Sequence, residues 1–501
     1  MISLYKNLKI LDCTFRDGGY YTTWDFNQEV VLSYFKYAEE LPIDYIEVGY
    51  RSTEKKSYLG EYFYLPKSTI KRILNHTTKK VVIMLNAKDF SSGESVRPLL
   101  EDLVQKVTMV RIAVNPFEIS NYLALVEEIK DLGFEIGLNL MYISKLIKNI
   151  DCLNNVKKFD GLIDYLYLVD SYGGVYPSEL RKIIQEVKCK TNIPLGFHGH
   201  NNMELAFTNT LTAIEEGVSL VDSTVLGMGR GAGNLKTELL LTHLKTKAGY
   251  IFDMTFLTKL VELFIPLKLE CKWGGNLPYM VSGSFSLPQQ DVMEALSINR
   301  YSLSGIVNSL DTAGKNELQK FCMGKYSSCL LVGGGENVEK HINAIKDFID
   351  KHKDLLVIHS TSRYLAIFDR INNDQILAVA GDELLKVKDF STIKCFVLEP
   401  SPRKINVPLP IQKNSYELNQ INFTQYKDSP LAISLQIAKD VVAKQVFLVG
   451  FDGYKESKTK KQTYLMNENQ KIINDFGANS IISFTPTNYK NLIVKSIYAN
   501  L

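Results

Sequence analysis

The amino-acid sequence predicts an α/β protein in three parts: an N-terminal (β/α)8 barrel of the TIM type, a helical extension and a C-terminal Rossmann-like α/β domain. Three observations lead to this prediction. Short β-branched runs alternate with longer amphipathic stretches through the first half of the chain, and several of these runs end in polar residues. Near Ser328 a second, shorter alternation of the same kind begins. Strands that alternate with helices form parallel sheets.

Eight runs are expected as barrel strands, and each is separated from the next by a segment that can hold a helix and two loops. They are Leu8–Leu11, Asp44–Val48, Val81–Leu85, Met109–Ala113, Glu135–Leu140, Tyr165–Val169, Leu195–His198 and Leu220–Val225. Eight strands in roughly 240 residues match the size of a closed barrel. A doubly wound open sheet would gather polar groups at one switch point and would separate the first strand from the seventh.

We place the barrel at residues 1–245, the helical extension at 246–326 and the α/β domain at 327–501. Helices of the extension are expected over 256–269, 289–297 and 315–322. In the C-terminal domain, a strand at 329–332, a glycine turn and a helix at 338–349 open a βαβ unit. Further strands of a three-layer domain are expected at 355–359, 376–380, 394–398, 445–449 and 480–484.

Composition excludes several classes of protein without indicating one. The 58 Lys and Arg against 55 Asp and Glu give a formal net charge of +3, which gives no basis for a nucleic-acid partner or an anionic membrane surface. The seven cysteines are scattered without a Cys-x-x-Cys pair, so neither a disulfide framework nor a structural zinc site is expected. No signal peptide or membrane span is recognised in the sequence. We therefore expect a cytoplasmic protein whose function resides in local sites.

The most informative local pattern is His198-Gly199-His200 at the end of the seventh expected strand. Residues at positions i and i+2 of a strand point to the same side, so both imidazoles can face one metal ion. The same pattern also occurs as a polar strand edge without a metal. From the residues alone, both interpretations stay open.

A second candidate segment, Thr14–Gly19, directly follows the first expected strand and contains Arg16 and Asp17. Its glycines are expected to allow a tight turn. In a closed eight-stranded barrel only the eighth strand separates the first from the seventh, so Asp17 can meet His198 and His200 at the rim. One oxygen and two nitrogen donors suit Mn²⁺, Mg²⁺, Co²⁺ or Zn²⁺. A loop salt bridge between Arg16 and Asp17 is the structural alternative.

A third candidate segment, Gly227–Gly233, follows the eighth expected strand and is followed by Asn234. Four glycines in seven residues let backbone N–H groups approach a ligand, and Asn234 offers a neutral oxygen. Glycine loops are common in proteins. This loop is a stronger candidate for ligand binding because the barrel prediction places it on the same rim as the other two segments.

Together these residues carry a family resemblance. Five motifs stand in order: Arg16-Asp17-Gly18, Ile46-Glu47-Val48-Gly49, Asp170-Ser171, His198–Asn202 and Gly231–Asn234. They resemble the motifs of the 3-hydroxy-3-methylglutaryl-CoA lyase-like (HMGL-like) metal-dependent TIM barrels. That superfamily includes 4-hydroxy-2-oxovalerate aldolase, the isopropylmalate, citramalate and homocitrate synthases, and carboxyltransferase domains. The resemblance covers about half of the chain and is greatest for the aldolase.

The resemblance implies roles for individual residues. Asp17, His198 and His200 would bind the divalent metal, for which Mn²⁺ is the first choice, and Asn234 would be a further ligand. Arg16 would stabilise enolate charge and Glu47 would orient Arg16. The residues implied to line the substrate pocket are Asp170, Ser171 and Asn139. The implied function is an aldolase or carbon–carbon lyase that acts on a small 2-oxo acid through a pyruvate-type enolate.

The chain departs from the aldolase pattern at Tyr20, where the aldolase has a histidine proposed to act as the base. Tyrosine is a weaker base at neutral pH. Tyr20 would act through metal-bound water, orient the substrate, or signal a different substrate. The tyrosine at this position also motivates an alternative in which the barrel is a catalytically weak scaffold. A separate alternative function is a Claisen-type acyltransferase that uses acetyl-CoA.

The C-terminal domain resembles, more weakly, the nucleotide-binding or nucleotide-sugar-binding units of bacterial surface-glycan proteins. The residues that carry this resemblance are Gly333, Gly334 and Gly335 together with Asp452. Neither the dinucleotide-binding nor the P-loop glycine motif is present. A second alternative function is thus ligand binding or glycosyl transfer by this domain with the barrel as a scaffold, and a dimerisation domain stays equally open. We expect a homo-oligomer and do not expect the dehydrogenase partner of the aldolase.

Overall fold

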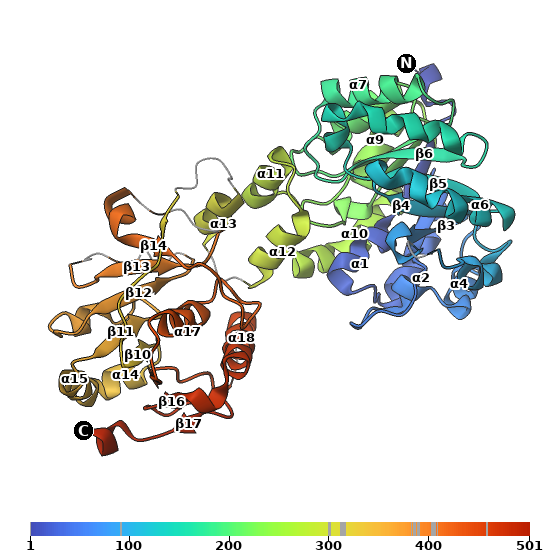
Figure 1. Cartoon of the computed structure of the whole chain (residues 1–501). Helices are drawn as coiled ribbons and strands as arrows, with labels where there is room; N and C mark the ends of the chain where they lie inside the picture. Colours follow the sequence, from blue (N-terminus) through green and yellow to red (C-terminus); the bar gives the residue numbers. More distant parts are fainter. Residues whose placement is uncertain are drawn as a thin grey trace. The chain divides into compact units, whose positions relative to one another are not determined.

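The computed structural model describes the chain except for residues 1, 91–92, 299–301, 311–316, 382, 384–386, 388–390, 402–406, 408 and 457–458. The chain divides into two compact units, Met1–Val292 and Met293–Leu501. In Figure 1 the first runs from blue to yellow-green and the second from yellow to red. The segment expected as a helical extension is thus shared between the two units.

The first unit contains a closed barrel of eight parallel strands, as predicted (Figure 1). Its strands are β1 (Lys9–Asp12), β2 (Tyr45–Tyr50), β3 (Lys80–Asn86), β4 (Met109–Val114), β5 (Glu135–Leu140), β6 (Tyr165–Asp170), β7 (Leu195–Gly199) and β8 (Leu220–Ser223). Pairing of β1 with β8 closes the barrel, with Lys9 opposite Leu220 and Asp12 opposite Ser223. Closure places the ends of β1, β7 and β8 side by side.

Helices and short 3-10 turns surround the barrel. The α-helices of the first unit are α1 (Thr14–Thr22), α2 (Gln28–Ala38), α3 (Glu61–Tyr64), α4 (Lys67–Leu74), α5 (Arg97–Leu100), α6 (Leu123–Asp131), α7 (Pro177–Lys188), α8 (Ala206–Glu215), α9 (Thr237–Lys247), α10 (Met254–Cys271) and α11 (Leu277–Ser284). Between β5 and β6 the crossover is built from 3-10 segments at Ile143–Lys148 and Ile150–Phe159. Helix α12 (Gln289–Ile298) spans the boundary between the units.

The barrel interior holds a fully buried cation, Arg111 on β4. Its Nη1 donates to Glu47 Oε2 at 3.1 Å, its Nη2 donates to Asp222 Oδ2 at 2.7 Å, and its Nε donates to Asn139 Oδ1 at 3.2 Å. The guanidinium lies 3.9 Å from the ring centroid of Tyr167. A charge inside a barrel requires paired partners, since an unpaired buried ion costs several kcal/mol. Five strands, β2, β4, β5, β6 and β8, are therefore tied together through one side chain.

The second unit contains a nine-stranded parallel sheet in the order β17-β16-β15-β10-β11-β12-β13-β14-β9. The strands are β9 (Gln319–Lys320), β10 (Ser328–Val332), β11 (Leu355–His359), β12 (Gln375–Val379), β13 (Cys395–Leu398), β14 (Ser415–Glu417), β15 (Gln445–Val449), β16 (Ile481–Ser483) and β17 (Ile493–Val494). All six predicted strands are present. The prediction of a helix over 315–322 is wrong within the described residues. Gln319–Lys320 pairs with β14 as an edge strand, so pairing with a distant segment overrides the local sequence pattern.

Helices cover both faces of this sheet, which confirms the predicted three-layer architecture (Figure 1). Helices α14 (Asn337–Lys340) and α15 (Ile342–Lys351) pack on one face and α17 (Pro430–Asp440) and α18 (Lys460–Phe476) on the other. Alternate residues of β10 enter the two cores, with Leu330 facing α15 and Leu331 facing α17. The single helix expected at 338–349 is thus two helices. Helix α13 (Leu303–Leu310) precedes the sheet.

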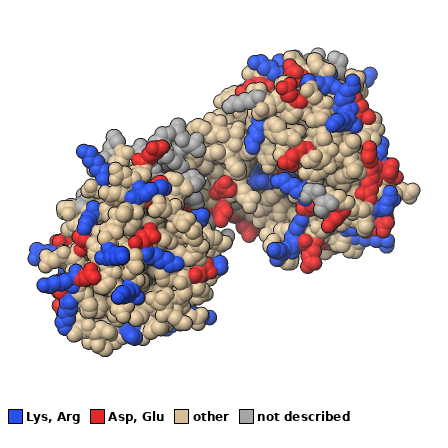
Figure 2. Space-filling view, in the orientation of Figure 1, with Lys and Arg blue, Asp and Glu red and all other residues tan. Residues whose placement is uncertain are grey.

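The surface shows no single dominant sign of charge on the face drawn in Figure 2, where blue and red side chains are interspersed. This agrees with the near balance of 58 basic and 55 acidic residues. In the part of the chain that the structure describes, no helix has the length and apolar character needed to cross a membrane.

Replacing Arg111 with Met should lower the free energy of unfolding by about 3–5 kcal/mol, because Glu47 and Asp222 would stay buried without their cation. Urea unfolding measures the change. The matched control is Arg181→Met, which removes a cation that is 43% exposed in its pair with Glu216 and should cost at most about 1 kcal/mol. Equal costs for the two variants would contradict the role assigned to Arg111.

Candidate active site

The candidate site lies where the carboxyl ends of the barrel strands meet. β1 leads into Arg16 and Asp17, β2 carries Glu47, and β7 carries His198. All four side chains are buried, with at most 7% of each residue exposed. Residues far apart in the sequence therefore come together at this rim, as barrel closure predicts.

Arg16 and Asp17 lie on helix α1 and not on a turn, so the expected turn is wrong. The helix starts directly after β1 because the Asp12 carboxylate accepts a hydrogen bond from the Thr14 amide at 3.0 Å. Its glycines have ordinary backbone angles and serve close packing. A Cβ on Gly18 would lie 2.6 Å from the Met228 sulfur, and one on Gly19 would lie 2.1 Å from the Trp24 ring.

Asp17 is the centre of the site. Its Oδ2 lies 3.5 Å from His198 Nε2 and its Oδ1 contacts Arg16 Nη1. Burial raises the pKa of Asp17, but Arg16 and the two histidines, His198 and His200, more than offset this and lower it to about 2. Asp17 is therefore an anion at neutral pH.

The two histidines of the predicted pair are oriented by separate partners. His198 Nδ1 donates to Asp222 Oδ2 at 2.8 Å, and His200 Nδ1 donates to the Asp170 carbonyl at 2.8 Å. Such bonds fix the tautomer and direct the other ring nitrogen, Nε2, toward a ligand. Burial lowers the pKa of His200 to about 3, so its imidazole is neutral at neutral pH. The ring centroids of His198 and His200 lie 4.9 Å apart.

The glycine loop after β8 brings Asn234 to the same place. Gly233 has φ +81°, and a Cβ there would lie 2.1 Å from the Gly227 carbonyl oxygen, so the loop can close on itself only with glycine. The backbone of Asn234 then pairs with that of His200 in an isolated antiparallel β-bridge. The Asn234 Nδ2 donates to Asp17 Oδ2 at 2.6 Å. Its own Oδ1 is buried and has no hydrogen-bond partner among the described residues.

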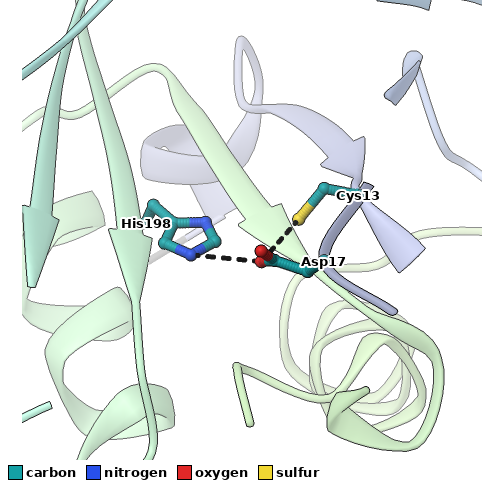
Figure 3. A group of neighbouring side chains, drawn as sticks. All are labelled: Cys13, Asp17 and His198. Atoms are coloured by element: carbon teal, nitrogen blue, oxygen red, sulfur yellow. Dashed lines mark hydrogen bonds and ion pairs between the residues drawn. The ribbon is translucent and has the colours of Figure 1, made fainter. Parts of the chain in front are cut away.

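Cys13 is a neighbour that the sequence analysis did not assign to the site. One ligand atom from each of Cys13, Asp17 and His198 lies within 4.8 Å of the others. Figure 3 shows the thiol and the imidazole both directed at the Asp17 carboxylate. Burial raises the pKa of the Cys13 thiol well above its ordinary value, and the thiol donates weakly to Asp17 Oδ2 at 3.8 Å. These contacts make Cys13 a neutral packing partner of Asp17.

A continuous ring of buried polar and charged side chains connects the residues of the site to the barrel interior. Arg16 Nε donates to Glu47 Oε2 at 2.7 Å, and Arg111 links Glu47 to Asp222, which in turn holds His198. We call this set of residues the charge ring; its members are Asp17, Arg16, Glu47, Arg111, Asp222 and His198. The ring contains three carboxylates and two guanidinium groups.

This arrangement fits a divalent cation. The charge ring sets three carboxylates against two guanidinium groups in a buried setting, where an excess of carboxylates is costly unless a further cation offsets it. Asn234 Oδ1 is a buried acceptor without a hydrogen-bond partner among the described residues, beside Asp17 and His200. Asp17 and His198 face each other here, and binding of an ion by Asp17, His198 and His200 with Asn234 as a further ligand stays a prediction.

Tyr20 forms a second group at the rim with Arg230 and Tyr50. Arg230 Nη2 donates to the Tyr20 hydroxyl at 2.7 Å, and its guanidinium lies 4.2 Å from the Tyr20 ring centroid. The Tyr20 and Tyr50 hydroxyls are 3.2 Å apart. Arg230 is largely buried, and its Nε has no hydrogen-bond partner in the described part of the chain. A cation and two hydroxyls are thus available beside Asp17.

The three residues expected to line the substrate pocket make structural contacts. The Asp170 carboxylate accepts from the amides of Gly174 and Val175 at 3.3 and 3.1 Å, and burial raises its pKa to about 6. Ser171 Oγ accepts from the Tyr142 amide at 2.8 Å. Asn139 holds Arg111, as described above. Contact of these three with a substrate stays a prediction.

Sequence reasoning missed Asp222, Arg230 and Cys13 as members of the site. Asp222 had a signal, since it is a charged residue inside the apolar run Leu220–Val225 and therefore had to face either the barrel interior or a partner. Arg230 also had a signal, because it is the one charged residue in the glycine loop. The only sequence signal for Cys13 is its position directly after a buried strand.

Comparison with known proteins agrees with this geometry. The HMGL-like family model matches residues 111–263. A 4-hydroxy-2-oxovalerate aldolase from Pelotomaculum thermopropionicum is 30% identical over 251 residues, which are 48% of this chain and 71% of that protein. An oxaloacetate decarboxylase from Mycobacterium tuberculosis is 26% identical, over 49% of this chain and 73% of its own length.

Among solved structures, the N-terminal domain of a proposed aldolase from Bacteroides vulgatus matches with a TM-score of 0.57 and 44% identity. The match covers 60% of this chain and 99% of that one. Fold, motif order and sequence identity therefore agree over the barrel, and the chain belongs to the HMGL-like family of lyase-type enzymes.

Proposed function

We propose that this chain is a divalent-metal-dependent aldolase or carbon–carbon lyase that acts on a small 2-oxo acid through a pyruvate-type enolate. One observation carries the proposal: the buried carboxylate of Asp17 contacts the guanidinium of Arg16 on one side and faces His198 on the other. A fixed cation and a site that fits a divalent ion are thus adjacent. An enolate oxygen is best stabilised by such a pair.

The names of two relatives support a common intermediate. An aldolase that cleaves a 4-hydroxy-2-oxo acid and a decarboxylase that acts on oxaloacetate both break the bond between C3 and C4 of a 2-oxo acid. In both reactions the electron pair of that bond passes into the enolate of pyruvate. The shared requirement is a group that holds the C2 oxygen while it carries negative charge.

Asp17, His198 and His200 would hold the metal, with Asn234 Oδ1 as a further ligand. Oxygen and imidazole donors without a thiolate suit Mn²⁺, and also Mg²⁺, Co²⁺ or Zn²⁺. The ion, when bound, would supply Lewis-acid stabilisation of the developing enolate charge. Asp222 and the Asp170 carbonyl fix the two imidazoles before any ligand arrives.

Arg16 would donate to the enolate oxygen. Its Nε is held by Glu47 at 2.7 Å and its Nη1 contacts Asp17. Glu47 is in turn held by Arg111, so the plane of the Arg16 guanidinium is set by the barrel interior. A donor fixed in advance needs no reorganisation during the reaction, which is the main source of electrostatic catalysis.

Tyr20 would act at the 4-hydroxyl of the substrate. In cleavage, the hydroxyl proton leaves, the C3–C4 bond breaks, C4 becomes an aldehyde, and C3 of the enolate later takes up a proton to give pyruvate. The Tyr20 hydroxyl accepts a hydrogen bond from Arg230 and lies beside the Tyr50 hydroxyl. These contacts orient Tyr20, whose hydroxyl would take up the substrate proton while releasing its own proton to water, so that the tyrosine stays neutral.

Replacing His198 with Ala should weaken Mn²⁺ binding more than about 100-fold, because even the outer partners of a ligand change affinity by about 10–100-fold. Isothermal titration measures the affinity, and the exchange of pyruvate methyl protons in D₂O, followed by NMR, reports enolate formation. The control is His76→Ala, at an exposed histidine, which should match the wild type in both. Unchanged metal binding and exchange in His198→Ala would refute the proposal.

Replacing Tyr20 with Phe should slow cleavage of 4-hydroxy-2-oxo acids by about 100-fold or more, the usual contribution of a proton-transfer group. Exchange of pyruvate protons should fall much less, because it needs Arg16 and the metal but has no 4-hydroxyl. Tyr58→Phe, at a tyrosine that is 75% exposed, is the control. An equal loss in both reactions would show that Tyr20 acts on the enolate and not on the hydroxyl.

The acyltransferase alternative is tested with the same protein. Acetyl-CoA together with a panel of 2-oxo acids would release free CoA thiol if the enolate came from the acetyl group. Release of CoA without pyruvate formation from 4-hydroxy-2-oxo acids or oxaloacetate would favour that alternative over the aldolase.

A further inference from the structure

The second unit contains a cavity of about 770 Å³ that the proposed barrel chemistry does not use. Gly333, Ser360 and Gly450 line it, and each directly follows the carboxyl end of a strand, namely β10, β11 and β15. These three strands are neighbours in the sheet. The cavity is therefore built at the carboxyl edge of the parallel sheet.

This edge is also the point where the strand order reverses. From β10 the chain proceeds through β11, β12, β13 and β14 in one direction, whereas β15, β16 and β17 are added on the other side of β10. The loops after β10 and β15 consequently turn to opposite faces, and a crevice opens between them. In open α/β sheets this switch point is where ligands bind.

The two loops at the switch point are joined backbone to backbone. The Gly335 amide donates to the Gly450 carbonyl at 2.7 Å, and a Cβ on Gly333 would lie 2.5 Å from that same oxygen. Gly333 and Gly450 therefore serve loop packing. Gly334 differs, because a Cβ there would meet only the Thr361 methyl at 3.5 Å, and its φ is not positive. Neither packing nor backbone conformation therefore requires a glycine at position 334, which borders open space.

Asp452 is held at the edge of this cavity with one oxygen unused. Its Oδ2 accepts from the Asn337 amide at 3.1 Å, and its backbone carbonyl accepts from the Asn488 amide at 2.8 Å. Its Oδ1 is buried and has no hydrogen-bond partner among the described residues. A buried carboxylate oxygen without a donor is costly, and a ligand hydroxyl would satisfy it.

The remaining lining supplies cations, an aromatic face and two further carboxylates, Glu336 and Glu468. Glu336 lies 3.5 Å from the Lys340 ammonium. Lys340, Arg363 and Lys455 line the cavity, and Arg363 Nη1 donates to the Gly334 carbonyl at 2.7 Å. Tyr454 also lines the cavity and is 37% exposed. Phosphate oxygens match the cations, sugar hydroxyls match Asp452, and a planar base matches the tyrosine. The volume lies within the range of about 300–1,000 Å³ usual for small-molecule sites.

We propose that this cavity binds a nucleoside phosphate, with Gly334 leaving the space that the ligand occupies and Asp452 accepting hydrogen bonds from its sugar. The site is separate from the barrel chemistry, since all its residues lie in the second unit.

The test uses the full-length protein and titrates CMP, UDP, ADP and GDP by isothermal calorimetry, with thermal unfolding as a second readout. At least one of the four should bind and raise the unfolding temperature. Ribose 5-phosphate and inorganic pyrophosphate are included in the same series and should bind at least tenfold more weakly. Absence of binding by all four nucleotides, or equal binding of the fragments that lack a base, would overturn the proposal.

Two variants locate the site. Gly334→Phe should weaken nucleotide binding at least tenfold by filling the cavity, whereas Gly324→Phe should leave it unchanged, because Gly324 also has open space but lies outside the cavity. Asp452→Asn, which keeps the shape of the side chain, should weaken binding by a similar factor. Wild-type affinity in Gly334→Phe would overturn the assignment.

Pyruvate proton exchange should be the same in Gly334→Phe, Gly324→Phe and Asp452→Asn as in the wild type. Failure of the nucleotide site is thereby distinguished from failure of the aldolase proposal. Wild-type nucleotide affinity in Asp452→Asn would contradict the role of its carboxylate.

Discussion

The candidate active site depends on the two ion pairs that the Arg111 guanidinium forms inside the barrel. It is fully buried inside the barrel, and it holds Glu47 and Asp222 at the same time. Glu47 orients Arg16 and Asp222 orients His198, so one side chain fixes both the cation and the imidazole at the rim. Neither orientation comes from the loops, which are the mobile parts of most barrels. The Arg16 guanidinium and the His198 imidazole are therefore both positioned by residues on strands, which is the kind of preorganisation that electrostatic catalysis requires.

Most of the barrel and of the second sheet could be predicted from the sequence, because each long strand is an apolar run of four to seven residues between segments that can form helices. The short strands β9 and β14 at one side of the sheet and β17 at the other could not be predicted. They contain two or three residues each and exist because a neighbouring strand offers backbone hydrogen bonds. A local pattern gives no information about such a neighbour, and for Gln319–Lys320 it indicated a helix instead.

The candidate site shows the same division between local and non-local information. Asp17, His198 and Asn234 stand out because their residue types and spacing indicate a metal site. The helix that carries Asp17 is not evident from the sequence, because Gly18 and Gly19 suggest a turn. Gly18 is required by the distant Met228, and Gly19 by the Trp24 ring that folds back onto the helix. Likewise, the partners of a buried charge become known only when the strands are placed in order, as for Asp222 and Arg111.

The two units use glycine loops at the carboxyl ends of parallel strands in opposite ways. In the barrel, Gly233 closes the loop on itself and so presents a side chain, Asn234, to the centre of the site. In the second sheet, Gly333 and Gly450 bind the loops to each other and leave Gly334 beside empty space. The first arrangement suits chemistry performed by side chains and a metal, which must be placed precisely. The second suits a ligand held against the backbone, which needs room more than reactive groups.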